Sequence, residues 1–345
     1  MVHPGFEEHH KAYFKFFVLL EIFRKNIFIN SVLLLPYIFL VRLPSIVYPA
    51  AYPLTETTNT LQGLVYVLFP DALLQNIIAN ILIFIHALLI NHIFIKHRLS
   101  REITLLPGLI YVVLVSVVAD GVLLSPVLMS TTFIMLAVIN LLRTYKLPNP
   151  SAYIFNSGFY LSIASLFYTP YIFMVLFGVI ILLILRSFKL LEKLQYFAGF
   201  ILPYFFLFTY KYWADIKFVE LSFIQDIFFR WPQIRQDSLI VFFITVGIIC
   251  LAIILAIINY GNLTGKKSIQ IQKKVDIFYW ILLYSLVSFL IFSTNGVLHL
   301  LTLAFPLAIL TGILISDSKA RIAQELFHFL ILTLIFLTQF KMLII

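Results

Sequence analysis

RLPSIVYPAAYPLTETTNTLQGLVYVLFPD, residues 42–71, is the first long interruption between two apolar segments of the chain. Its four prolines forbid one continuous helix, because proline lacks a backbone N–H and clashes with the preceding turn. Its tyrosines suit a membrane–water boundary, where one end of the ring is in water. Residues 55–59 form a polar cluster, and the apolar run 64–69 is too short to cross a bilayer. We expect a loop at the outer surface of a membrane.

The composition of the chain indicates an integral membrane protein. Of 345 residues, 62% are hydrophobic and 11% are charged, whereas a soluble domain carries roughly 25% charged residues. The net charge of +9 fits the Lys and Arg residues that collect in cytoplasmic loops, so nucleic-acid binding is not expected. The single cysteine, Cys250, lies in an apolar segment, and we expect it to be a small buried hydrophobe.

The apolar segments are numerous enough for about eleven membrane spans. The predicted spans are 27–41, 72–95, 103–119, 122–142, 153–168, 171–185, 194–213, 239–258, 277–292, 297–315 and 322–340. This threading puts about eighteen of the 24 Lys and Arg residues on one side, which predicts a cytoplasmic amino terminus and an outer carboxyl terminus. The predicted fold class is an all-α, polytopic transmembrane helical bundle in a bacterial inner (cytoplasmic) membrane.

The predicted organisation has three parts. Residues 1–25 form a cytoplasmic end with an interfacial amphipathic helix. Residues 26–238 form a seven-helix module with outer loops at 42–71 and 214–238. Residues 239–345 form the carboxyl-terminal transmembrane helices. Apolar residues recur at helical spacing in the second outer loop, which is typical of an amphipathic helix on a membrane surface.

Two sets of residues predict helix packing inside the bundle. Asn76, Asn80 and Asn91 fall on one face of the second predicted span. Asparagine in lipid needs a partner, so this face either packs on other helices, the favoured interpretation, or lines a ligand cavity. Gly158, together with Ser162 and Ser165, forms a small-residue face that lets two helix backbones approach closely.

Familiar catalytic motifs are missing from the sequence. It has no Gly-rich phosphate loop of the Walker or Rossmann type, no HExxH and no cysteine pair. Glu325 and His328 have the spacing of half a carboxylate-bridged metal site, but no second such pair accompanies them. We interpret them as a membrane-facing polar pair near the cytoplasmic interface.

The order of long and short outer segments resembles that of a known enzyme class. The two long ones follow the first and seventh predicted spans, and the other outer turns are tight. Three stretches add to the likeness: NIIANILIFIHALLINHIFIKHRL (76–99), NSGFYLSIASLFYTPYIFMVLF (156–177) and LQYFAGFILPYFF (194–206). Across about 42–213 the chain resembles the GT-C class of membrane glycosyltransferases, which use polyprenyl-phosphate-linked sugars. It also resembles bacterial polytopic inner-membrane proteins of unassigned function.

The GT-C resemblance implies candidate site residues. An acidic residue of the first outer loop would act as base or metal ligand, which points to Glu56 and, less well placed, Asp71. The adjacent acidic pair that many members carry is absent. Arg42, Arg230 and Arg235 would bind the lipid phosphate. The alternatives are a solvated or helix-capping Glu56 and arginines that extend to the outer headgroups.

Three functions follow from these residues. The favoured one is a non-catalytic scaffold or accessory subunit of a membrane complex. The second is a glycosyltransferase that uses a polyprenyl-phosphate-linked sugar on the outer face, and the third is a lipid or small-molecule transporter. The expected partners are membrane lipid, other inner-membrane proteins and, for the enzyme, the polyprenyl-phosphate-linked substrate. No cofactor is expected, apart from a divalent metal if the chain is catalytic.

Overall fold

The computed structural model describes residues 19–51, 60–118, 123–187, 189–215, 239–265, 267–291 and 299–341. Within these ranges the chain is all-helical, with 84% helix and no strand, which confirms the predicted all-α class. Glu56, Arg230 and Arg235 lie outside the described residues.

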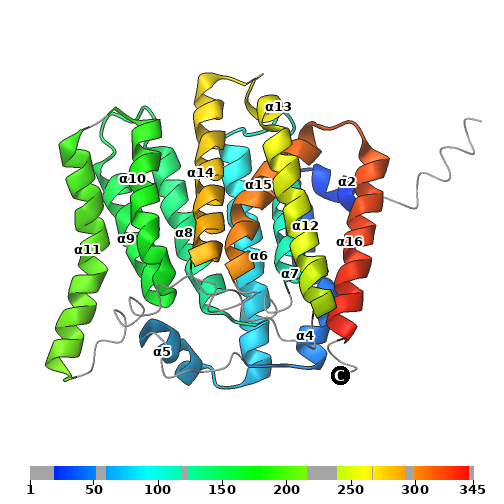
Figure 1. The fold of residues 1–345 in the computed structure, drawn as a ribbon, viewed down its shortest axis with the longest axis horizontal. Coiled ribbons are helices and arrows are strands. Elements are labelled where there is room, and N and C mark those ends of the chain that lie inside the picture. Colours follow the sequence, from blue (N-terminus) through cyan, green and yellow to red (C-terminus); the bar gives the residue numbers. More distant parts are fainter. Residues whose placement is uncertain are drawn as a thin grey trace, which may run out of the picture.

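Long helices occupy the segments that the sequence predicts as spans, and Figure 1 shows them packed side by side as one bundle. They are α3 (Phe28–Val41), α6 (Ala72–Lys96), α7 (Leu106–Val117), α8 (Pro126–Arg143), α9 (Ser151–Phe167), α10 (Met174–Leu185), α11 (Leu190–Trp213), α12 (Leu239–Ile258), α14 (Ile269–Ile291), α15 (Leu301–Asp317) and α16 (Arg321–Lys341). The shorter ones are α2 (Leu19–Arg24), α4 (Leu43–Val47), α5 (Thr60–Leu68), η3 (Thr169–Phe173) and α13 (Tyr260–Thr264).

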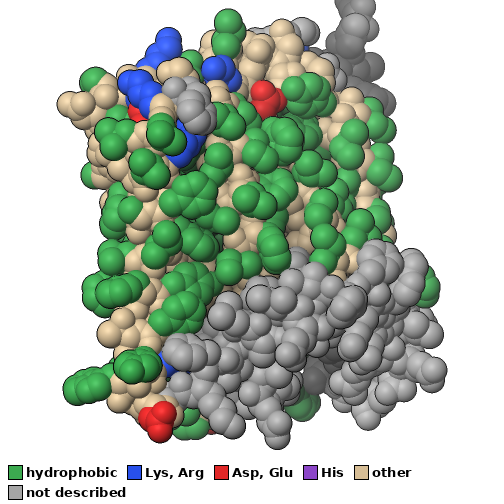
Figure 2. Space-filling model, turned by 60° about the vertical axis from the view of Figure 1, so that its left-hand side comes forward, with side chains coloured by type: hydrophobic (Ala, Val, Ile, Leu, Met, Phe, Trp, Pro, Cys, Tyr) green, Lys and Arg blue, Asp and Glu red, His purple; other side chains and the backbone are tan. Residues whose placement is uncertain are grey.

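The two ends of the bundle differ in charge. At one end, called the basic end here, lie the end of α6 at Lys96, the end of α8 at Arg143 and the start of α14. The opposite end carries α4 and α5 and the start of α6 (Figure 1). Figure 2 shows Lys and Arg side chains gathered at the top of the molecule, with a broad hydrophobic surface below them. This pattern is the one expected of a bundle that sits in lipid.

The helix lengths are consistent with a membrane protein. By length and composition, four helices of the described chain could cross a bilayer: α6, α8, α14 and residues 321–339 of α16. The apolar helices α3, α7 and α15, the continuous segment of η3 and α10, and the part Phe242–Ile258 of α12 are shorter. The full set of about eleven spans and its orientation therefore stay predictions. Several boundaries differ by a few residues, and the largest difference is at α14, which begins at Ile269 rather than at 277, so Lys273 and Lys274 lie in the helix instead of in a loop.

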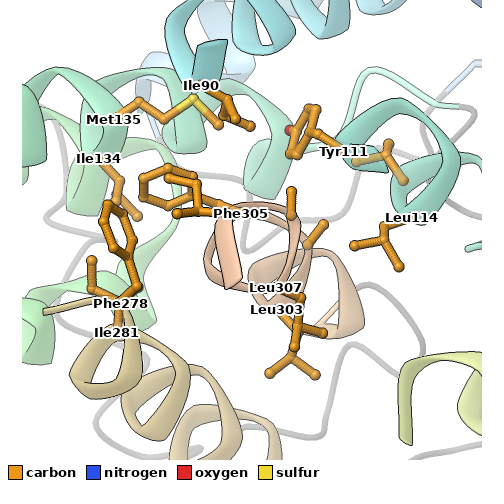
Figure 3. Close-up of a cluster of buried hydrophobic side chains, with 14 of the residues drawn as sticks. Ile90, Tyr111, Leu114, Ile134, Met135, Phe278, Ile281, Leu303, Phe305 and Leu307 are labelled. Atoms are coloured by element: carbon orange, nitrogen blue, oxygen red, sulfur yellow. The ribbon is translucent and has the colours of Figure 1, made fainter. Parts of the chain in front are cut away.

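The core of the bundle is built around α15. Its residues from Leu301 to Ile313 are all buried, as expected for a helix that is apolar on every side. Figure 3 shows Leu303, Phe305 and Leu307 of α15 surrounded by side chains of other helices. These neighbours are Ile90 of α6, Tyr111 and Leu114 of α7, Ile134 and Met135 of α8, and Phe278 and Ile281 of α14. The carboxyl-terminal helices thus share one core with the amino-terminal ones.

Glycines set the approach of α9 and α11. A Cβ atom on Gly158 would lie 2.1 Å from the carbonyl oxygen of Tyr196, and one on Gly199 would lie 2.1 Å from that of Phe155. Gly178 of α10 leaves room for the Tyr196 ring, whose hydroxyl donates to the carbonyl of Val175 at 3.0 Å. The small-residue face predicted at Gly158 is therefore a true close contact between helix backbones.

Candidate functional site

The asparagines of α6 bond to three neighbouring elements. Asn76 donates from Nδ2 to the carbonyl of Ser45 in α4 at 2.9 Å. Asn80 accepts at Oδ1 from Nε of Arg42, at the end of α3, at 2.6 Å. Asn91 accepts at Oδ1 from the backbone N–H of Gly108 in α7 at 2.8 Å. The predicted polar face therefore holds α3, α4 and α7 against α6, because each amide meets a group on a different element.

Arg42 lies inside the protein rather than at its surface. It is the C-cap residue of α3, and none of its surface is exposed. The turn into α4 fixes it, because Ser45 donates from Oγ to the Arg42 carbonyl at 2.7 Å. The alternative in which Arg42 extends to lipid headgroups is therefore wrong, because its side chain is buried and Nε donates to Asn80 inside the bundle.

A second set of buried polar groups continues from Tyr111 across the bundle. His86 of α6 makes two hydrogen bonds, one between Nδ1 and the Tyr111 hydroxyl (2.8 Å) and one between Nε2 and the Thr132 hydroxyl (2.7 Å). These bonds join α6, α7 and α8. A buried histidine with both ring nitrogens bonded is held in one orientation, since rotation would break both bonds.

Two tyrosines extend this set to η3 and α14. Tyr171 and Thr131 line the same small cavity, and the ring centroid of Tyr171 lies 6.1 Å from that of Tyr284. Tyr284 donates to the carbonyl of Pro170 at 2.9 Å. A cavity of about 10 Å³ lies between them, about the size that holds one water molecule. We call the whole set the buried polar layer: Arg42, Asn76, Asn80, His86, Tyr111, Thr131, Thr132, Tyr171 and Tyr284.

The predicted site residues are only partly brought together. The structure unites Arg42, Asn76 and Asn80 in the buried polar layer. Asp71 is exposed at the opposite end, where its Oδ2 accepts from the backbone N–H of Leu74 at 3.0 Å and caps α6. This cap satisfies one of the free N–H groups at the helix start, which is a structural role.

No group of three or more His, Cys, Asp or Glu side chains among the described residues is placed to hold a metal ion. The pair on α16 also has structural partners. Glu325 accepts from the backbone N–H of Leu20 at 2.8 Å, and His328 bonds through Nε2 to the Tyr37 hydroxyl at 3.2 Å. Both are buried, so the prediction of a membrane-facing pair is wrong.

Charged groups cross-link the connections at the basic end. Arg186, after α10, binds both carboxylate oxygens of Glu192, at 3.0 and 2.9 Å. Lys267 lies 3.4 Å from Asp317 and donates to the carbonyl of Leu99 at 2.6 Å. Burial lowers the pKa of Lys267, and Asp317 opposes that shift. Next to it, burial and then the charge of Lys274 lower the pKa of His97 to about 3.

Sequence reasoning missed most of the buried polar layer. Its members on α7, α8, η3 and α14 are tyrosines and threonines in otherwise apolar segments, with no common spacing. His86 was the available signal, because an ionisable residue near the middle of a predicted span needs a partner.

One comparison with known proteins gives a match. A family model described as a family of unknown function, DUF6427, matches residues 61–345, from α5 to the end of the chain. The chain belongs to this family. No curated protein and no solved structure matches it.

Proposed function

We propose that this DUF6427 member is a multi-pass protein of a bacterial inner membrane that serves as a non-catalytic scaffold or accessory subunit of a membrane complex. The observation that supports this most is the contact between Arg42 and Asn80. A guanidinium that binds a lipid phosphate must present its N–H groups to a cavity. Arg42 is fully buried and directs Nε to an amide of the same chain, which favours a role in helix packing.

We also propose that the chain has a GT-C-like arrangement of outer loops, which the positions of the two long loops support. Segment 52–59 is flanked by α4 and α5, and segment 216–238 follows α11. Helices α4 and α5 and the last turn of α11 all lie at the end of the bundle opposite the basic end (Figure 1). The Lys and Arg residues that cross-link loops lie at the basic end. Basic loops face the cytoplasm in membrane proteins, so we assign the basic end to the cytoplasm and the two loops to the outer side.

A contact surface for a partner subunit is offered by α11, which stands at the edge of the bundle beside α9 (Figure 1). Its outward side exposes a run of large apolar side chains towards the opposite end, among them Phe205, Phe206 and Tyr210. In lipid, aromatic and apolar faces of this kind gain packing energy when they meet a second transmembrane helix.

The test is purification in mild detergent, with identification of bound proteins and lipids by mass spectrometry. A scaffold predicts a membrane protein partner in fixed stoichiometry, released when Phe205 and Phe206 are both replaced by alanine. The matched control is Leu190→Ala plus Leu191→Ala, at the basic end of the same helix. A chain that purifies alone, with no partner before or after cross-linking, contradicts the proposal.

A glycosyltransferase is the second candidate, because the two helices that flank segment 52–59, α4 and α5, are both anchored to the bundle. Asn76 of α6 donates to the carbonyl of Ser45 in α4, and Tyr66 of α5 donates to the carbonyl of Leu124 at 2.7 Å. The enzyme predicts that Glu56→Gln abolishes sugar transfer by membranes that contain the protein, while the variant still purifies folded. Unchanged transfer in Glu56→Gln membranes excludes Glu56 as the catalytic base.

A further inference from the structure

Two cavities meet at the basic end of the bundle, away from the buried polar layer. One is polar, has a volume of about 310 Å³ and is lined by Arg101, Lys267 and Asp317 among others. The other is apolar, has a volume of about 390 Å³ and lies between α12, α16, α7 and α15. Leu314 of α15 lines both, so the cavities are neighbours.

The two cavities are stacked along the helix axes. Leu255, near the end of α12, lines the apolar cavity, and Asn259, the residue that follows α12, lines the polar one. On α15, Thr311 lines the apolar cavity and Asp317 the polar one. Four residues of helix rise by about 6 Å, so a ligand with a polar head and an apolar tail can occupy both cavities at once.

The polar cavity carries an excess of positive charge. Lys267 and Arg101 supply two cations, and Asp317 supplies the carboxylate. That carboxylate is already engaged by Lys267 at 3.4 Å, by the Ser100 hydroxyl at 2.7 Å and by the backbone N–H of Arg101 at 3.2 Å. The Arg101 side chain is exposed, so it can turn towards a ligand without breaking the core. An anionic group fits this charge balance.

The apolar cavity has the chemistry of an acyl-chain site. Leu251, Ala252 and Leu255 of α12 form one wall, and Ala323, Phe327 and Ile331 of α16 form another. In Figure 1 these two helices stand next to each other at the edge of the bundle, where a bilayer would surround them. A lipid chain could therefore enter from the side.

We propose that an anionic phospholipid binds here, with its phosphate between Arg101 and Lys267 and one acyl chain in the cavity between α12 and α16. Basic pockets between transmembrane helices on the cytoplasmic side suit anionic headgroups, because that leaflet is rich in them. The site is independent of the scaffold and glycosyltransferase proposals, since it lies at the basic end and uses none of their residues.

The test is native mass spectrometry of the full chain, titrated with phosphatidylglycerol or phosphatidylcholine. The wild type should retain one phosphatidylglycerol in preference to phosphatidylcholine. Arg101→Gln should reduce this preference about fivefold, and the double variant with Lys267→Gln about 25-fold, since each cation beside an anionic headgroup contributes about equally. Lys189→Gln, an exposed change at the basic end beside α11, is the control and should leave the preference unchanged.

The acyl-chain site has its own pair of variants on α12. Ala252→Phe fills the cavity and should release the lipid, whereas Cys250→Phe, on the exposed side of the helix, should not. The same preference in wild type and Arg101→Gln overturns the headgroup assignment. Full lipid retention in Ala252→Phe, or a change only in oligomeric state, shows that the cavity holds no acyl chain and overturns the proposal.

Discussion

The Nε atom of Arg42 lies 2.6 Å from Oδ1 of Asn80, and both side chains are shut off from the surface. This contact joins the end of α3 to α6 at the opposite end of the bundle. A buried charged donor has already lost its hydration, and without a partner nothing offsets that cost. Removing the acceptor of Arg42 should therefore destabilise the fold more than the hydrogen bond itself stabilises it.

Replacing Asn80 by leucine should lower the free energy of unfolding by about 2–3 kcal/mol, because a buried charged donor loses its acceptor. Asn80→Asp is the matched control: it keeps an acceptor oxygen at the same place and should retain most of the stability. The measurement is the unfolding midpoint of detergent-solubilised protein. Equal midpoints for Asn80→Leu and the wild type would show that the contact contributes nothing.

Gly158→Ala should be strongly destabilising for so small a change. The added Cβ would lie 2.1 Å from the backbone oxygen of Tyr196, which forces α9 and α11 apart. Gly247→Ala on α12 is the control, because nothing lies within 4 Å of its added Cβ. There alanine should be neutral or stabilising by about 0.5–1 kcal/mol, since it favours the helix. Thermal unfolding of both variants checks this, and a harmless Gly158→Ala would refute the close contact.

Stability should fall on acidification at the basic end. The pKa of His97 is about 3 in the folded protein, because of burial and the charge of Lys274, and about 6.5 in an unfolded chain. Between these two pKa values the unfolded state binds more protons than the folded state. The contribution of His97 to stability is therefore complete above pH ~6.5 and is lost as the pH falls towards 3. His97→Gln should show a smaller loss of unfolding midpoint between pH 7 and pH 5. Identical pH profiles would exclude His97 as the titrating group.

The positions of the helices could be predicted from the sequence, because apolar segments of sufficient length must form helices in lipid. The asparagines of α6 were also visible, since polar residues at helical spacing in such a segment need partners. What each helix side faces could not be predicted. Lipid and protein interior are equally apolar, so a leucine facing either one looks the same in the sequence.

Cys250 illustrates this limit: it was expected to be buried, and it is exposed on α12. Glu325 and His328 illustrate the reverse error, because their partners, Leu20 and Tyr37, lie about 300 residues away along the chain, as the separations of 305 and 291 show. The cavity between α12 and α16 could not be found for the same reason. It is formed by small and branched residues from helices that are distant in sequence.

We assign the basic end and the loop that carries Glu56 to opposite sides of the membrane. This assignment is tested most directly by labelling single cysteines in spheroplasts with a membrane-impermeant maleimide, in a Cys250→Ser background. Glu56→Cys should react in intact spheroplasts, and Lys319→Cys, exposed between α15 and α16, should react only after permeabilisation. Reaction of both positions under the same condition would place them on one side and contradict the account.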